Sequence, residues 1–189
     1  TKTAQQAERA GKVIRRIRGF VKRSDPIRKF IDPSQLVAEA IDLAEIDARG
    51  LGFDIEQHLP QGLPAIFVDP ILIEQVLLNL IKNGLDAMRE SAERLLVVRV
   101  EASADEITFS VIDRGAGVAP EMRERLFDSF YTTKAEGMGM GLNICRSIIE
   151  SHQGRLWFED NPDVGSRFCF WLPLHVESTD TPVESKEIE

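Results

Sequence analysis

The sequence predicts an α+β protein, and three features of the chain carry this prediction. Apolar residues recur at helical spacing after two Asp-Pro pairs, at residues 32–33 and 69–70. Such pairs are typical of a capped helix N-terminus with proline in the first turn. Alternating residues over 95–104 and 107–112 predict a β-hairpin. Residues 113–141 then form a long glycine-containing loop, and long loops inside a domain are usually functional.

Further elements are expected in order along the chain. The first helix should run from residue 33 to about Ala48 and end at Gly50. The second should run from residue 70 to about Ser91, and a short helical piece should follow Pro120. A last helix is expected at 141–151. Strands are expected at 28–31, 51–58, 65–68, 95–104, 107–112, 155–159 and 166–172.

Composition excludes several classes of protein. The chain has 189 residues, of which 43% are hydrophobic and 29% charged, so it can bury a core. Its net charge of -8 disfavours a nucleic-acid-binding role. Cys145 and Cys169 are too few for a disulfide framework or a metal cluster and fit a reducing cytoplasm. The longest apolar stretch, residues 71–81, is too short and too polar to span a bilayer, so no membrane contact is expected.

The chain divides into three expected regions. Residues 1–27 are basic, 28–174 form the body, and 175–189 are an acidic tail expected to be disordered. Residues 4–24 predict a helix with an apolar heptad seam, which is typical of half a helical hairpin. A surface helix packed on its own domain is the alternative. The seam residues are Ala7, Ala10, Ile14, Ile17 and Val21. Because the chain begins at Thr1 without Met, we expect a fragment of a longer protein.

Three groups of residues suggest a binding site. Asn79, Asn83 and Asp86 share one face of the second helix, and their side-chain oxygens suit Mg2+, although an ordinary amphipathic helix would look similar. Asp113 ends a strand before Gly115 and Gly117. A carboxylate there can accept from an exocyclic amine, and glycines allow a ligand to approach the backbone. A common Asp-x-Gly turn is the alternative.

The third group lies in the long loop. Gly137, Gly139 and Gly141 lead into a helix, whose free N–H groups suit phosphate, although a flexible hinge is also possible. No P-loop or dinucleotide fingerprint is present in this segment. Aromatic residues just before it are expected to pin the loop as a lid, and the polar residues that follow them suit phosphate. The aromatic residues are Phe127, Phe130 and Tyr131, and the polar ones Thr132, Thr133 and Lys134.

In this order, these blocks resemble the ATP-binding domain of sensor histidine kinases, within the GHKL superfamily. "NLIKNGLDAM" is similar to the N box, "DRGAG" and "GMGMGL" to the two glycine boxes, and "FDSFYTTK" to the F box. The resemblance covers residues 4–174 and is greatest to the oxygen-sensing nitrogen-fixation and nitrogen-regulation kinases. It implies a Bergerat-type two-layer α/β sandwich, with helices on one face of a mixed sheet, preceded by one dimerisation-type helix.

The resemblance also implies ATP and Mg2+ as cofactors and a role for each site residue. Asn83 would hold Mg2+, with Asn79 near the phosphates, and Lys134 would pair the phosphates from the lid. Asp113 would bind the adenine amino group, with Ser166, in place of a usual threonine, assisting through a water. Asn79 and Lys134 are the expected catalytic residues. The whole expected nucleotide set is Asn79, Asn83, Asp86, Asp113, Gly115, Gly117, Thr132, Thr133, Lys134, Gly137, Gly139, Gly141, Leu142 and Ser166.

The implied activity is transfer of the γ-phosphoryl of ATP to a histidine. His58, His152 and His175 lack the acidic neighbour and downstream proline of the family's phosphoacceptor, so that helix is expected to be missing from this chain. The expected partners are therefore that helix, a response-regulator receiver domain and, in the full-length protein, a second copy. An ATP-hydrolysing switch is the main alternative, but such ATPases carry glutamate where Asn79 stands, and asparagine cannot accept a proton. A nucleotide-insensitive dimerisation module is the other alternative.

Overall fold

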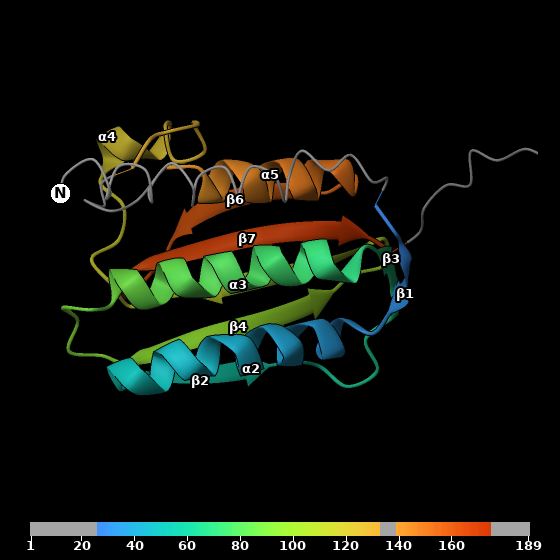
Figure 1. The fold of residues 1–189 in the computed structure, drawn as a ribbon, viewed down its shortest axis with the longest axis horizontal. Coiled ribbons are helices and arrows are strands. Elements are labelled where there is room, and N and C mark those ends of the chain that lie inside the picture. Colours follow the sequence, from blue (N-terminus) through green and yellow to red (C-terminus); the bar gives the residue numbers. More distant parts are fainter. Residues whose placement is uncertain (1–25, 133–138, 175–189) are drawn as a thin grey trace, which may run out of the picture.

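The computed structural model describes residues 26–132 and 139–174. The helix expected at 4–24 and the acidic tail expected from residue 175 onward lie outside the described residues. Within them, α2, α3 and α5 cover one face of a five-stranded sheet, as Figure 1 shows. The predicted two-layer α/β sandwich is confirmed.

Helices and strands are interspersed along the described chain. The helices are α2 (Pro33–Leu51), α3 (Pro70–Ala87), α4 (Pro120–Arg123) and α5 (Gly141–Ser151). The strands are β1 (Lys29–Ile31), β2 (Asp54–His58), β3 (Ile66–Val68), β4 (Leu95–Ala102), β5 (Glu106–Ile112), β6 (Arg155–Asp160) and β7 (Ser166–Pro173).

The large sheet has the strand order β2-β4-β5-β7-β6. Strand β2 is parallel to β4, whereas the remaining neighbours are antiparallel, so the sheet is mixed as expected. Strands β1 and β3 form a separate antiparallel pair. In the large sheet, Ile112 at the end of β5 lies opposite Arg167 near the start of β7. This register brings Asp113 beside Ser166, although they are 53 positions apart in the chain.

The two Asp-Pro pairs begin helices as predicted. The Asp32 carboxylate accepts from the amide of Ser34 at 2.8 Å and caps α2. The Asp69 carboxylate accepts from the amides of Ile71 and Leu72 at 3.1 and 3.3 Å and caps α3. Each cap satisfies amides that have no partner inside the helix, which stabilises a helix by about 1 kcal/mol.

Both helix ends differ from the prediction. Helix α2 continues past Gly50 to Leu51, because Gly52 and not Gly50 takes the left-handed conformation, at φ 72°, that ends the helix. This extension delays β2, which starts at Asp54 rather than at Leu51. Helix α3 ends at Ala87 instead of near Ser91. Ser91 leaves the helix, and its hydroxyl donates to the Arg114 carbonyl at 2.7 Å.

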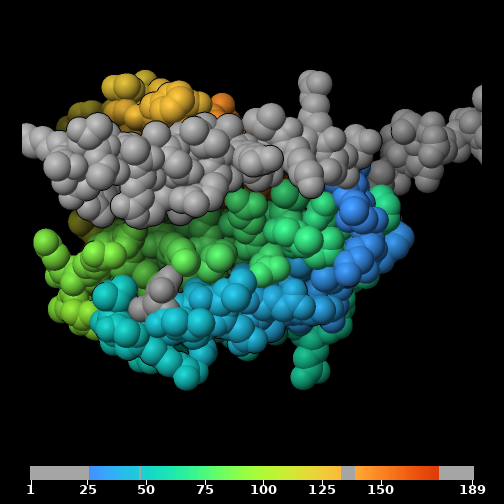
Figure 2. Space-filling view, viewed as in Figure 1, coloured from blue at the N-terminus to red at the C-terminus, as the bar shows by residue number. Residues whose placement is uncertain are grey.

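The core lies between the helices and the sheet. The apolar face of α3 is almost fully buried there, as the sequence predicts, and α2 packs beside α3 in Figure 2. The buried residues of this α3 face are Val76, Leu77, Leu80, Ile81, Leu85 and the C-cap Met88. From the sheet, Phe109 stacks on Phe170 with ring centroids 4.7 Å apart. Burying each large apolar side chain contributes about 1.5–3 kcal/mol, so the core anchors α3 firmly against β4 and β5.

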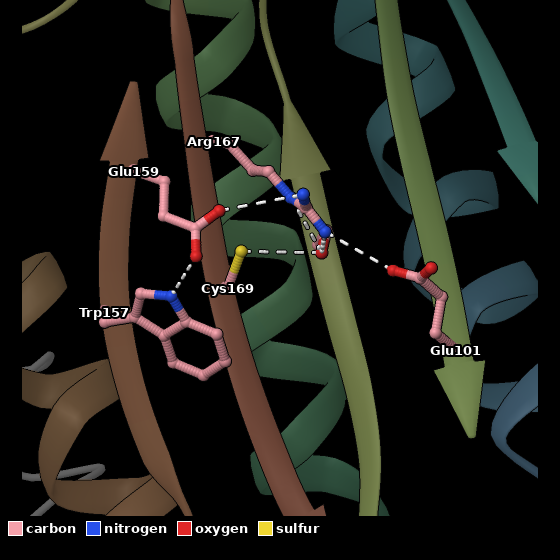
Figure 3. A network of polar contacts seen from close by, with 6 residues as sticks. Glu101, Trp157, Glu159, Arg167 and Cys169 are labelled. Atoms are coloured by element: carbon pink, nitrogen blue, oxygen red, sulfur yellow. Dashed lines mark hydrogen bonds and ion pairs between the residues drawn. The ribbon is translucent and has the colours of Figure 1, made fainter. Parts of the chain in front are cut away.

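The sheet face away from the helices carries a polar network centred on Arg167 (Figure 3). Its guanidinium lies 3.3 Å from Glu101 and 3.6 Å from Glu159, and donates to the Ser110 hydroxyl at 3.0 Å. The Ser110 hydroxyl also lies 3.5 Å from the Cys169 sulfur. The network therefore ties β4, β5, β7 and β6 together. No helix within the described residues is long and apolar enough to cross a membrane.

Candidate functional site

Asp113 follows the last residue of β5 and is only 2% exposed. Its Oδ1 accepts from the backbone amides of Gly115 at 2.9 Å and Ser166 at 3.1 Å. Burial raises the pKa of Asp113, while these hydrogen bonds and one from the Ser166 hydroxyl oppose the increase. The paired strand ends thus hold a buried carboxylate in one fixed orientation.

Glycines allow the backbone to close around Asp113. A Cβ on Gly84 of α3 would lie 2.6 Å from Leu96 and 3.3 Å from the Cβ of Asp113. A Cβ on Gly115 would lie 2.5 Å from the Ala87 carbonyl oxygen, so Gly115 packs against the end of α3. These approaches leave no room for a side chain. Gly117 takes the left-handed conformation at φ 73° beside this turn, so Gly115 serves backbone packing and Gly117 serves the path of the chain.

Two further residues of this site were not predicted from the sequence. The Asn161 side-chain amide donates to the carbonyls of Asp113 at 3.0 Å and Val164 at 2.8 Å. Gly165 takes φ 104°, and a Cβ there would lie 2.2 Å from the Asp113 carbonyl oxygen. The Asn-Pro pair and the glycine predict a turn between β6 and β7, but not its contact with Asp113.

The polar face of α3 meets the first turn of α5. Asn79 and Asn83 are half-buried, and the Asn79 Nδ2 donates to the Cys145 sulfur at 3.2 Å. A Cβ on Gly141, the first residue of α5, would lie 2.7 Å from the Asn79 Oδ1. Asp86, further along the same helix, forms a 2.9 Å ion pair with Arg89. The structure thus brings Asn79 and Gly141, both expected site residues, close together, and adds Cys145 as a contact that the sequence analysis missed.

The loop between the two glycine blocks is anchored at Phe127 but not at Phe130. Phe127 packs against the core, and the Asn143 side chain of α5 donates to its carbonyl at 3.0 Å. Phe130 is 75% exposed, so the expectation that its ring pins the lid is wrong. Its backbone is left-handed at φ 67°, and its amide donates to the Gly139 carbonyl at 2.8 Å. The guanidinium of Arg125 lies over the Tyr131 ring, 4.4 Å from its centre.

Of the remaining expected site residues, some lie within the described part of the chain and others lie outside it. Thr132 is exposed, and Gly139 takes φ 63°. Leu142, in the first turn of α5, is half-buried and packs against the core. Three predicted residues, Thr133, Lys134 and Gly137, lie outside the described residues.

Residues 68–176 match the family model described as histidine kinase-, DNA gyrase B-, and HSP90-like ATPase. The chain belongs to this ATPase family. The match spans α3, both glycine blocks and the closing strands, so it covers the elements that surround Asp113 and Asn79.

Relatives of this ATPase domain include two bacterial sensor proteins. The chain is 42% identical to the C4-dicarboxylate transport sensor protein DctS of Rhodobacter capsulatus, over 93% of this chain and 27% of DctS. It is 42% identical to the sensor protein FixL of Bradyrhizobium diazoefficiens, over 94% of this chain and 35% of FixL. The chain thus spans 27% and 35% of the length of these two curated relatives.

Solved structures give the same family assignment. The nucleotide-free catalytic domain of histidine kinase ThkA is 30% identical, with a TM-score of 0.70, over 77% of this chain and 95% of that one. ThkA in complex with the response regulator protein TrrA is 26% identical, with a TM-score of 0.73, over 91% of this chain and 49% of that one. The fold of this ATPase domain is therefore that of a histidine kinase catalytic domain.

Two histidines of the ATPase domain form hydrogen bonds with neighbouring residues. The exposed His58 lies 2.6 Å from the Glu56 carboxylate on the same strand. His152 is 3% exposed, and its Nε2 accepts from the Asp69 amide at 3.1 Å. Burial, with Arg28 nearby, lowers the pKa of His152. The third, His175, lies outside the described residues.

The donor chemistry of the site fits magnesium held partly by a nucleotide. Within residues 26–132 and 139–174, no group of three or more His, Cys, Asp or Glu side chains could hold a metal ion. Asn79 and Asn83 instead offer amide oxygens one helical turn apart. Magnesium commonly takes one or two protein oxygens and completes its shell with water and phosphate, so these residues fit such an ion.

Proposed function

We propose that this chain is the catalytic part of a sensor histidine kinase, and that it transfers the γ-phosphoryl of Mg-ATP to a histidine. That histidine would lie on a dimerisation helix of the parent protein, and a response-regulator aspartate would receive the phosphoryl group next. The observation that carries the proposal is the buried, rigidly held Asp113, combined with the meeting of Asn79 and the N-terminus of α5.

Adenine recognition is assigned to the Asp113 end of the site. Two backbone amides fix Oδ1, so the plane of the carboxylate is set and its other oxygen can accept from the adenine amino group. Ser166 would assist through a water, and Gly115 and Gly117 would shape this end of the pocket. A rigid acceptor in a buried position favours a base with a donor at that point, because an unpaired carboxylate there is costly.

Phosphate binding is assigned to the first turn of α5 and the loop before it. Free N–H groups at a helix N-terminus attract phosphate oxygens, which gives roles to Gly139, Gly141 and the amide of Leu142. When bound to Asn83, Mg2+ would neutralise charge on the phosphates. Asn79 and Lys134 would position the transferred group. The same proposal assigns Gly137, Thr132, Thr133 and Asp86 to the surroundings of the phosphates.

The half-buried Asn79 disfavours the rival function of ATP hydrolysis. An asparagine amide cannot take a proton from water, so this site lacks a general base at the position where the family's ATPases carry glutamate. Positioning and charge neutralisation are sufficient for phosphoryl transfer to a well-placed nucleophile. The site is therefore suited to holding ATP until a histidine arrives.

Known structures support the proposed ligands and partners. Full-length ShkA in complex with AMPPNP is 26% identical, with a TM-score of 0.70, over 79% of this chain and 32% of that one. ThkA was solved with the response regulator TrrA. By analogy, we assign residues 1–27 to the second helix of a dimerisation hairpin, 28–174 to the catalytic domain and 175–189 to an acidic tail. This fragment would lie in the cytoplasm, as part of a homodimer in the full-length protein, and its net charge of -8 disfavours nucleic-acid binding.

The test is phosphoryl transfer in trans. The chain is incubated with radiolabelled ATP and Mg2+, with and without the separately expressed first dimerisation helix of its parent protein. We expect acid-labile, base-stable label on the added helix and none on the chain alone. Label on the chain that survives replacement of His58, His152 and His175 would contradict the proposal. Steady phosphate release would instead favour the hydrolysing switch, and failure to bind any ATP analogue would favour a dimerisation module.

A further inference from the structure

The Asn79 side chain lies against two residues of α5. Its Nδ2 donates to the Cys145 sulfur at 3.2 Å, and its Oδ1 is the atom nearest to the point where a Cβ on Gly141 would lie, 2.7 Å away, with Nδ2 at 3.2 Å. Gly141 and Cys145 are four residues apart on α5 and therefore face the same side of that helix. The amide group of Asn79 thus lies over one helix face, with its nitrogen bonded to Cys145 and its oxygen beside Gly141.

Cys145 has the properties of a fixed, neutral acceptor. Its side chain is 1% exposed, and the neighbouring helix turn buries Ile148 and Ile149. Burial raises the pKa of the Cys145 thiol to about 12, so the sulfur stays protonated at neutral pH. A buried thiol of this kind is unreactive toward solutes, and within its environment the sulfur accepts the Asn79 amide hydrogen.

We infer that Cys145 is a positioning residue of the nucleotide site, whose sulfur determines which end of the Asn79 amide points toward Gly141. The inference rests on the proposed function, because it gives the orientation of Asn79 a role in binding Mg-ATP. The two ends of an amide are nearly equal in size but opposite in hydrogen bonding, since oxygen accepts and nitrogen donates. Packing alone therefore selects between them poorly, and the donation from Nδ2 to the sulfur is the contact that distinguishes the two orientations.

Orientation matters because of what the amide faces. With Nδ2 held by sulfur, the oxygen of Asn79 is presented at the first turn of α5, where the phosphates and their magnesium are assigned. If the amide rotated by half a turn, the NH2 group would be presented there instead, and a carbonyl oxygen would lie against the thiol. Losing the sulfur acceptor should thus weaken Mg-ATP binding while leaving the adenine end of the site unchanged.

Binding measurements on four cysteine variants test the inference. Cys145→Ala removes the acceptor, and Cys145→Ser replaces it with a hydroxyl oxygen. Cys169→Ala and Cys169→Ser are matched controls, because Cys169 is also fully buried. Its sulfur lies 3.5 Å from the Ser110 hydroxyl, on the face of the sheet away from the helices. We expect Cys145→Ala to weaken Mg-ATP binding about threefold to tenfold, as for one lost neutral hydrogen bond. Adenosine affinity should stay unchanged, Cys145→Ser should restore binding to within about twofold, and both controls should match the wild type.

A spectroscopic measurement separates positioning from simple packing. The side-chain amide of Asn79 gives a pair of proton signals, assigned from their loss in Asn79→Ala, and a hydrogen bond to sulfur shifts one of the pair. We expect this shift of one proton signal to be lost in Cys145→Ala and in Cys145→Val, which fills the space without an acceptor. The shift should be retained in Cys145→Ser. If Cys145→Ala does not fold, Cys145→Val replaces it in both assays.

The outcomes distinguish this inference from the proposed function. If the wild type binds no ATP, the proposed function fails, and the positioning role of Cys145 fails with it, whatever the amide signals show. If the wild type binds ATP but Cys145→Ala and Cys145→Val bind it equally well, the positioning inference alone is overturned. Equal loss of adenosine and Mg-ATP affinity would also overturn it, because that pattern marks a general loss of packing.

Discussion

At the scale of single residues, the site depends on hydrogen bonds that fix the direction of each polar group. Asp113 is held by two amides that donate to the same carboxylate oxygen. Because both amides donate, the atom at this position must be an acceptor. The second terminal atom of the side chain then points away from these amides. It therefore makes the effect of a nearly isosteric substitution predictable.

Asp113→Asn should weaken ATP binding about tenfold to a hundredfold, corresponding to about 1–3 kcal/mol for a lost buried polar contact. The amides of Gly115 and Ser166 would take the asparagine oxygen, so its NH2 group would face the adenine amino group, and two donors would oppose each other. Titration with a fluorescent ATP analogue measures the change. The control is Asp54→Asn, an exposed residue on β2. Equal affinity in Asp113→Asn and the wild type would exclude the adenine assignment.

Gly165→Ala should lower the free energy of unfolding by about 2–5 kcal/mol, because it combines backbone strain with a steric clash. Its φ is 104°, and the new Cβ would lie 2.2 Å from the Asp113 carbonyl oxygen. Gly62→Ala is a matched control, since φ there is 72° but nothing lies within 4 Å of a Cβ. Urea denaturation of both variants provides the measurement. A loss no larger than that of Gly62→Ala would show that the contact with Asp113 relaxes freely.

The residues that sequence analysis identified are those whose chemistry is local. Asp113 at a strand end and glycines before a helix are visible in a short window of the chain. Asn161 and Gly165 could not be found in this way, because their contact with Asp113 exists only after β5 and β7 pair. Cys145 was likewise counted only as a cysteine, since its partner Asn79 is 66 positions away.

At the scale of elements, helix starts were easier to predict than helix ends. An aspartate followed by proline specifies a start through its own side chain and ring, whereas an end depends on competing partners. Ser91 could have continued α3, but its hydroxyl bonds Arg114 instead. Gly50 could have ended α2, but Gly52 takes the left-handed conformation. The N-terminus of α5, which carries the proposed phosphate site, begins at Gly141 as predicted.

The junction between α3 and α5 should make stability depend on pH. His152 ends α5, accepts from the amide of Asp69 at the start of α3, and has Arg28 nearby. Burial lowers its pKa below the ordinary 6.5, so the unfolded chain binds a proton at a pH where the folded chain does not. This contribution to stability is present above about pH 6.5 and is lost as the pH falls toward the folded-state pKa.

His152→Gln should therefore reduce the loss of stability between pH 7.5 and 5.5, as measured by urea denaturation at a series of pH values. The comparison variant is His58→Gln, which removes an exposed histidine whose hydrogen bond is to Glu56 on its own strand. If His152→Gln retains the full pH dependence of the wild type, other groups carry it and the junction does not.

At the scale of the whole molecule, the buried residues form one continuous core between Ile31 and Leu174. Three helices and the sheet contribute to it. The site is assembled on this core from α3, α5 and the ends of β5 and β7. Stability and nucleotide binding should thus be properties of the body.

A chain of residues 26–174 alone should fold and bind ATP with an affinity within about twofold of the full chain, because it contains the whole of the described core, from Ile31 to Leu174. Urea denaturation and analogue titration of both lengths provide the comparison. A large drop in the unfolding midpoint would show that residues 1–25 or 175–189 complete the core. Loss of binding without loss of stability would instead place part of the nucleotide site in those segments.

The strand order has a consequence for self-association. It leaves β2 and β6 at the two open edges of the sheet, and unpaired edges invite edge-to-edge aggregation. The five residues of β2 include Asp54 and Glu56, both acidic and both largely exposed. A second β2 strand aligned beside it would bring like charges together, and the strand is short. The same edge that completes the sheet therefore discourages its growth into a fibre, and replacing both carboxylates by neutral amides would remove that protection.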